Sequence, residues 1–288
     1  MNKTVAHKKI FPLLKSSVDT ILSNRIILLP YISIVFVQLL VVEMLYFSNR
    51  FPLIAFFGPI IRTIWKESFL HYPLNLFLLP ELFQQVQIPL FVFMNSFFVA
   101  ASIGIISLLN NSKKVYLKNI YQDTLKSYVY LVIAAVLSTS LLLLIFKLLG
   151  LVYHRAEIIR STSGVFYIIK VIVMNGTPYF SLMGSIFVTT LFAFVAPVIM
   201  IEKKKIFSAL FINFKMVFKY FWTILGVVFI PTFVFIVVLL LRNSLPNDLP
   251  IPEIRLWTLV GSIILMAVID MIVNTAVTTF YLLDKEIK

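Results

Sequence analysis

The chain has 288 residues, of which 60% are hydrophobic and only 13% are charged, and its mean hydropathy is +1.00. A soluble domain carries about 25% charged residues, so this chain has too few charges to cover a water-facing surface of its size. These values exclude a soluble globular enzyme, a disordered chain and an ordinary nucleic-acid-binding protein. The net charge of +13 instead favours contact with an anionic lipid surface. The absence of cysteine excludes disulfides and Cys-based metal sites.

Apolar runs long enough to cross a membrane occur six times along the chain. A transmembrane helix needs about 20 predominantly apolar residues, and its backbone must be helical because hydrocarbon offers no water to bond. We therefore predict an all-α, polytopic membrane protein with a single transmembrane domain over residues 1–288, and short surface helices in the outer segments 48–87 and 154–178. The predicted spans are Ile26–Phe47, Ile88–Leu109, Val129–Tyr153, Phe180–Ile201, Phe221–Leu241 and Leu256–Leu283.

Lysine and arginine are unevenly distributed between the two sides of the predicted membrane domain. Most of them lie in the N-terminal segment, in the connections after the second and fourth spans, and at the C-terminal end. By the positive-inside rule these segments face the cytoplasm. The predicted location is therefore the cell membrane, with both termini cytoplasmic.

An internal repeat is visible around these basic segments. Residues 8–14 and 204–210 are identical at five of seven positions, and in each copy apolar residues continue at helical spacing into the following span. The segment after the second span is a weaker third copy. We therefore predict a threefold repeat with units of about 1–110, 111–202 and 203–288, each containing a cytoplasmic amphipathic helix followed by two spans.

The lysines of these helices are the predicted points of contact with lipids or a partner protein. A short basic amphipathic helix lies in the headgroup plane, with its apolar side toward the hydrocarbon and its lysines near the lipid phosphates. An ordinary membrane-surface linker with no separate task is the alternative interpretation. The candidate contact residues are Lys8, Lys9, Lys113, Lys114, Lys203, Lys204 and Lys205.

Three polar residues within the predicted spans are further candidates for function. Asp270 lies near the middle of the sixth span with Asn274 one turn later, and Glu43 lies in the outer third of the first span. A charged side chain inside a span costs about 2.5–3.5 kcal/mol on the insertion scale. We expect Asp270 to face the bundle interior, where it bonds either a neighbouring helix or a bound solute.

Sequence motifs of common catalytic sites are absent. There is no Gly-rich loop ending in Gly-Lys-Ser/Thr, no Gly-x-Ser-x-Gly and no His-Glu-x-x-His. The three histidines are far apart in sequence, whereas a metal site needs several converging ligands. We therefore predict no catalytic residues, no metal site, no cofactor and no enzymatic activity.

The repeated pattern of a basic helix entering a span resembles the six-helix membrane domain of some bacterial glycerophosphodiester phosphodiesterases and its stand-alone relatives. Residues 201–210, 220–226 and 279–284 carry this likeness. The catalytic barrel of those enzymes has no counterpart in the chain, so no catalytic residue is carried over. The resemblance implies an accessory membrane module, and the long outer segment 48–87 departs from it.

These observations leave three hypotheses for function. The first is a non-catalytic accessory or scaffold module that contacts anionic inner-leaflet lipids or partner proteins. The alternative is the permease subunit of an ABC-type exporter whose basic cytoplasmic helices dock a separate ATPase. The third is an intramembrane enzyme that uses Asp270 or Glu43. None of the three involves nucleic acid as a partner.

Overall fold

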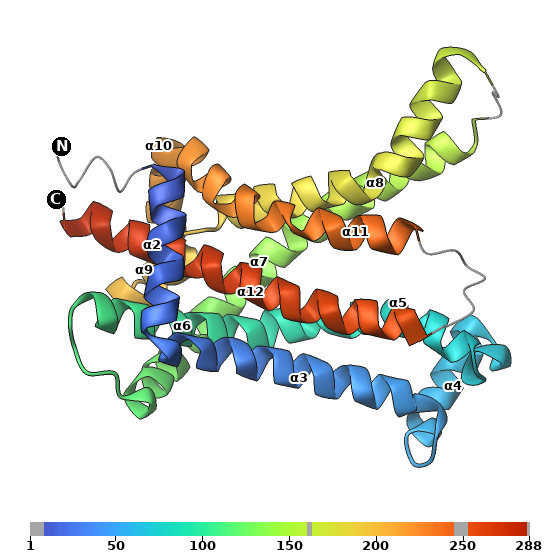
Figure 1. Cartoon of the computed structure of the whole chain (residues 1–288), viewed down its shortest axis with the longest axis horizontal. Helices are drawn as coiled ribbons and strands as arrows, with labels where there is room; N and C mark the ends of the chain where they lie inside the picture. The colour runs from blue at the N-terminus through green and yellow to red at the C-terminus, as the bar shows by residue number, and fades with distance from the viewer. Residues whose placement is uncertain (1–8, 160–162, 245–252, 287–288) are drawn as a thin grey trace.

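The computed structural model describes residues 9–159, 163–244 and 253–286, and this part of the chain contains helices and no β-strand. Figure 1 shows an elongated bundle whose long helices run side by side. In chain order the elements are α2 (Ile10–Ser23), η1 (Arg25–Ile27), α3 (Leu28–Tyr46), η2 (Phe47–Asn49), α4 (Ile54–Trp65), η3 (Glu67–Leu70), α5 (Leu74–Leu90), η4 (Phe91–Asn95), α6 (Ser96–Asn110), α7 (Leu117–Glu157), α8 (Gly164–Leu191), α9 (Val195–Glu202), α10 (Ile206–Phe233), α11 (Phe235–Ser244) and α12 (Glu253–Glu286).

Six helical segments of the described chain are long and apolar enough to cross a membrane, which confirms the predicted number. Four of them join consecutive elements: η1 with α3 and η2, α5 with η4 and α6, α8 with α9, and α10 with α11. The chain therefore has the architecture of an all-helical, multi-pass membrane protein. The segments are Arg25–Asn49, Leu74–Asn110, Leu117–Glu157, Gly164–Glu202, Ile206–Leu241 and Glu253–Glu286.

The second and fourth helical segments begin well before the predicted spans. The prediction placed their first residues at Ile88 and Phe180, whereas the helices begin at Leu74 and Gly164. The surface helix expected within 154–178 is therefore the first part of α8 and the last part of α7. Hydropathy locates only the part of a helix that hydrocarbon can solvate. A helix that has already nucleated continues through less apolar residues at little cost per residue.

The hairpin of α7 and α8 is much longer than a bilayer is thick. α7 has 41 residues, which corresponds to about 60 Å at a rise of 1.5 Å per residue, against a hydrocarbon thickness of about 30 Å. Figure 1 shows the connected ends of α7 and α8 projecting beyond the other helices. Much of this projection is apolar and exposed, including Leu151, Phe166 and Ile172.

α2 lies across one end of the bundle and not along it, as Figure 1 shows. It packs on α12 and α10. Leu13 and Ser17 are buried in this contact, while Phe11 and Leu22 on the same helix are 73% and 71% exposed. Asn24 and η1 then turn the chain from α2 into α3.

α10 also changes direction where it enters the bundle. Tyr220 has non-helical backbone angles (φ −123°, ψ 24°) inside this helix. A second break at Val234 follows Pro231, whose missing N–H and ring disturb the helical hydrogen bonds around it. α7, in contrast, continues from Leu117 to Glu157 as one helix.

The largest cluster of buried apolar side chains in the described residues includes much of α9, α10 and α12. The ring of Phe194, just before α9, lies 6.0 Å from the rings of both Phe280 and Tyr281 on α12. All three side chains are at most 2% exposed. α12 also contacts α2, α3, α5 and α6, so the C-terminal helix packs against the N-terminal half of the bundle as well as against α10.

Candidate functional site

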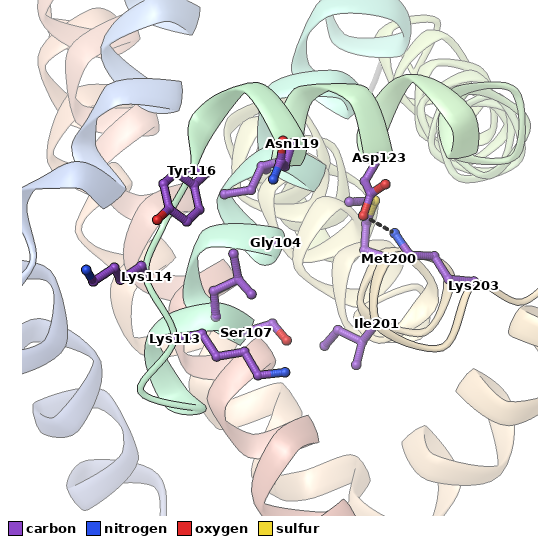
Figure 2. Close-up of a pocket in the computed structure, with 12 residues that line it drawn as sticks. Gly104, Ser107, Lys113, Lys114, Tyr116, Asn119, Asp123, Met200, Ile201 and Lys203 are labelled. Atoms are coloured by element: carbon purple, nitrogen blue, oxygen red, sulfur yellow. Dashed lines mark hydrogen bonds and ion pairs between the residues drawn. The ribbon is translucent and has the colours of Figure 1, made fainter.

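A cavity of about 560 Å³ lies at the end of the bundle that also carries α2 and the last turns of α12. Its walls come from α6, the connection 111–116, the first turns of α7 and the end of α9. Figure 2 shows these residues around the opening. The lining residues are Gly104, Ser107, Leu108, Lys113, Lys114, Tyr116, Asn119, Ile120, Asp123, Met200, Ile201 and Lys203.

The way α6 ends places Lys113 at this cavity. Ser112 has a positive φ of 53°, and its N–H donates to the carbonyl of Leu109 at 3.0 Å. The N–H of Lys113 donates to the carbonyl of Leu108, also at 3.0 Å. This pair of bonds is a Schellman motif, in which one left-handed residue reverses the chain after the last helical turn. The reversal brings Lys113 back beside Ser107 of α6 (Figure 2).

The second basic wall forms in a similar way at the end of α9. Lys203 is left-handed (φ 54°, ψ 32°) and ends this helix. Its ammonium group donates to Asp123 Oδ2 on α7 at 3.2 Å, and Lys126 lies 3.7 Å from Oδ1 of the same carboxylate. A left-handed backbone is uncommon for a residue with a side chain. Both walls of the cavity are thus made by helices that stop at such a residue.

Gly104 lets the floor of the cavity form. A Cβ at this position would lie 3.1 Å from Cγ2 of Ile120 on α7 and 3.8 Å from Cε of Met200 on α9. Ala100, one turn earlier, is fully buried. Small residues at this spacing let helices approach closely. The close approach of α6 to α7 and α9 brings their polar ends around one opening.

The cavity has a surplus of positive charge. Three lysines and one carboxylate line it, and Lys203 is already paired with Asp123. Neither Lys113 nor Lys114 forms an ion pair with any residue that the structure describes. Figure 2 shows Lys114 pointing away from the other lining residues. Lys113 is therefore the lysine best placed to neutralise a bound anion, with the hydroxyl of Ser107 beside it.

The structure brings together only some of the lysines that the sequence singled out. Lys113, Lys114 and Lys203 share the cavity, whereas Lys204 and Lys205 are exposed in the link between α9 and α10. Lys9 is exposed at the start of α2, and Lys8 lies outside the described residues.

The intramembrane candidates lie elsewhere. Asp270 and Asn274 line a second, smaller cavity of about 200 Å³ near the middle of the bundle. Glu43 is exposed on the outer surface of α3 and lines neither of these cavities.

Sequence reasoning missed the polar residues that complete the lysine-lined cavity, namely Ser107, Tyr116, Asn119 and Asp123. Asp123 carried a signal that could have found it, because it is the only acidic residue between Asn110 and Glu157. A lone acid within a basic segment is a natural partner for one of its lysines. The other three gave no such signal, since polar residues are ordinary at helix ends.

Comparison with protein-family models, curated proteins and solved structures found no match to this chain. Among the described residues, no group of three or more His, Asp or Glu side chains is placed to hold a metal ion. The chemistry of the site must therefore be inferred from its own residues, which offer ammonium groups, hydroxyls and an amide to an anionic group.

Proposed function

We propose that the chain is a non-catalytic integral membrane protein that binds the phosphate-bearing headgroup of an anionic lipid in the lysine-lined cavity. It would act there as an accessory or scaffold module. The observation that carries this proposal is the unpaired Lys113 beside Ser107 in a cavity with surplus positive charge. An ammonium group and a neighbouring hydroxyl suit phosphate oxygens, which accept strong charge-assisted hydrogen bonds.

A lipid is favoured over a free anion because the cavity adjoins apolar surface. Leu125 and Val129 follow Asp123 along α7 and are 61% and 65% exposed. Apolar surface of this kind is solvated by acyl chains, and lysines near it meet the phosphate layer. The volume of about 560 Å³ lies within the usual 300–1,000 Å³ range of ligand pockets.

The same proposal gives the orientation in the membrane. We place the chain in the cell membrane with both termini, α2 and the lysine-lined cavity on the cytoplasmic side. The positive-inside rule supports this orientation. Lys203 and Asp123 support it as well, because their hydrogen bond holds two predicted cytoplasmic segments next to each other.

The threefold repeat and the resemblance to the phosphodiesterase membrane domain remain part of the proposal. α2 and the first part of α10 are each followed by a bend, at Asn24 and at Tyr220, before the chain enters the bundle. Phe11 and Phe207 occupy matching positions in the two copies and are 73% and 84% exposed. These residues suit helices whose apolar side meets lipid. The third copy is the weakest, since α7 has no bend at its entry.

The decisive experiment measures which lipids the purified chain retains. The protein would be reconstituted in nanodiscs containing equal amounts of phosphatidylglycerol and phosphatidylcholine, then released gently for native mass spectrometry. We expect preferential retention of phosphatidylglycerol and its loss in the double variant Lys113→Ala/Lys203→Ala. The matched control is Lys204→Ala/Lys205→Ala, which removes the same charge outside the cavity. Equal loss in both variants would show nonspecific attraction and refute a specific site.

Two further arms distinguish a lipid site from a free-phosphate site and from an ATPase docking surface. If inorganic phosphate at moderate concentration displaces phosphatidylglycerol completely, the site binds free phosphate and the acyl chains contribute nothing. If an ATPase co-purifies in mild detergent and charge reversal at Lys203, Lys204 and Lys205 releases it, the exporter-permease hypothesis replaces the present one. The exposure of Lys204 and Lys205 is the feature that a docked ATPase would use.

A further inference from the structure

The second cavity lies between the middle parts of four helical segments and opens at the outer surface of the bundle. It holds about 200 Å³ and is lined by η4, α6, α7, α8, α9 and α12. Its polar residues come from all four helical segments. They are Asn95, Ser96, Ser138, Thr189, Asp270 and Asn274. The sequence suggested only the two on α12, because the others are distant in the chain.

Asp270 has no cation to balance it. No lysine or arginine lines the cavity, and Asp270 forms no ion pair with any described residue. Tyr31 on α3 forms a hydrogen bond of 3.0 Å with Ser102 through its hydroxyl, which also interacts electrostatically with Asp270 and Asn274. A carboxylate inside a bilayer is unfavourable unless it is paired. A bound cation would supply the charge partner that the described residues do not provide.

The backbone next to the cavity departs from regular α-helix at the turn that carries Asn95. η4 is a single π-helical turn, Phe91–Asn95, which follows Pro89. Turns of this kind are rare and occur frequently at functional sites. This one ends at Asn95, which is 9% exposed and whose side chain makes no hydrogen bond with another described residue. Asn95 thus adds an amide to the cavity lining from a different helical segment than Asp270.

The rest of the lining is apolar and reaches the outer surface. Val99, Leu131 and Val273 form walls, while Phe91 and Met266 at the rim are 43% and 38% exposed. At this depth the outer surface of the bundle faces hydrocarbon. A water molecule occupies about 30 Å³, so the cavity has room for a charged head and a few methylene groups.

We propose that this cavity binds the ammonium group of a small amphiphilic primary amine that enters from the bilayer. The carboxylate of Asp270 and the side-chain oxygens of Asn95 and Asn274 accept its N–H groups, and its chain lies along the apolar walls toward Phe91 and Met266. A bare metal cation fits less well, because the lining supplies a single carboxylate and its apolar walls would have nothing to contact.

The test measures whether a bound amine protects Asp270 from chemical modification. The reagent is a carbodiimide that dissolves in the bilayer and modifies carboxyl groups accessible from the hydrocarbon. The wild-type chain in nanodiscs is treated with dicyclohexylcarbodiimide, and modification of each peptide is measured by mass spectrometry. We expect n-hexylammonium to slow modification of Asp270 about tenfold at ten times its Kd. The neutral 1-hexanol should give no protection. Glu43, exposed on α3, is the internal control and should react equally in all samples.

Each outcome decides the proposal. Protection of Asp270 by the amine and not by the alcohol supports the proposal. Weaker protection in Asn95→Ala or Asn274→Ala would identify the amide side chains that bind the amine. Equal protection by amine and alcohol would show an apolar pocket without cation recognition and would overturn the proposal. Lack of protection, or lack of any modification at Asp270, would overturn it as well. Asp270→Asn serves only to confirm the modified site, so the test does not depend on its folding.

Discussion

The side chain of Asn213 on α10 accepts a hydrogen bond of 2.9 Å from the backbone N–H of Phe194, in the turn between α8 and α9. Its amide nitrogen donates to the carbonyl of Leu191 at 2.7 Å. One fully buried side chain therefore satisfies two backbone groups that the break in the helix would leave without partners. It also fixes α9, and with it Lys203, relative to α10.

Replacing Asn213 by alanine should destabilise the chain. The substitution leaves the Phe194 N–H and the Leu191 carbonyl buried without partners, which costs about 1–3 kcal/mol per group in the general case. Thermal unfolding in detergent would measure the loss. Lys215→Ala on the exposed side of the same helix is the matched control and should unfold like the wild type. An unchanged unfolding temperature for Asn213→Ala would show that the turn is held by other contacts.

Enlarging Gly104 should narrow the lysine-lined cavity. Gly104→Ala gains about 0.5–1 kcal/mol of helix propensity, which offsets the slight shift that Ile120 must make from 3.1 Å. We therefore expect this variant to be nearly as stable as the wild type. The valine of Gly104→Val cannot be accommodated by a small shift, so overpacking should lower the free energy of unfolding by about 1–3 kcal/mol. This variant should also lose lipid retention.

Gly150 provides the control for these two variants. It lies on the same long helix as Ile120, and a Cβ there meets no atom within 4 Å. Gly150→Ala and Gly150→Val should both be tolerated, with Ala the more stable of the two. If Gly104→Val unfolds at the same temperature as Gly150→Val, the close approach of α6 to α7 is not tight.

Lys203 should matter more for lipid binding than its ion pair with Asp123 matters for the stability of the chain. Both side chains are about half exposed, at 51% and 49%, and exposed pairs contribute only about 0–1 kcal/mol. A double-mutant cycle with Lys203→Ala and Asp123→Ala, read by thermal unfolding, should give a coupling energy in this range. Lipid retention should still fall in Lys203→Ala. A coupling well above 1 kcal/mol would make the pair a structural element.

Single cysteines should report the orientation, because the natural chain contains none. Ser112 and Ser208 are exposed near the lysine-lined end, and Ser68 is exposed in η3 near the other end. In inverted vesicles, where the cytoplasmic side faces outward, a membrane-impermeant maleimide should label Ser112→Cys and Ser208→Cys. In intact cells it should label only Ser68→Cys. Labelling of Ser112→Cys and Ser208→Cys from opposite sides would contradict the proposed topology.

The positions of the six membrane helices follow from the sequence because hydropathy is a local property. About 20 consecutive apolar residues have only one stable arrangement in hydrocarbon, so Ile26–Phe47 and Leu256–Leu283 agree with α3 and α12 to within a few residues. The helix ends were less predictable. α5 extends back to Leu74 and α8 extends back to Gly164. Mean hydropathy stays high over these longer segments, so it does not mark where each helix begins. The first residue is set by packing and by the preceding turn.

Which residues meet was decided only by the tertiary structure. The sequence indicated Lys113, Lys203 and Asp270, but it could not place Asp123 against Lys203 or Asn95 in the same cavity as Asp270. Such contacts depend on the rotation of each helix about its own axis and on its tilt relative to its neighbours. Those angles are set by side-chain packing between distant segments, such as Ile120 against Gly104. Solvation by hydrocarbon fixes that a helix forms, whereas close packing fixes which of its sides faces each neighbour.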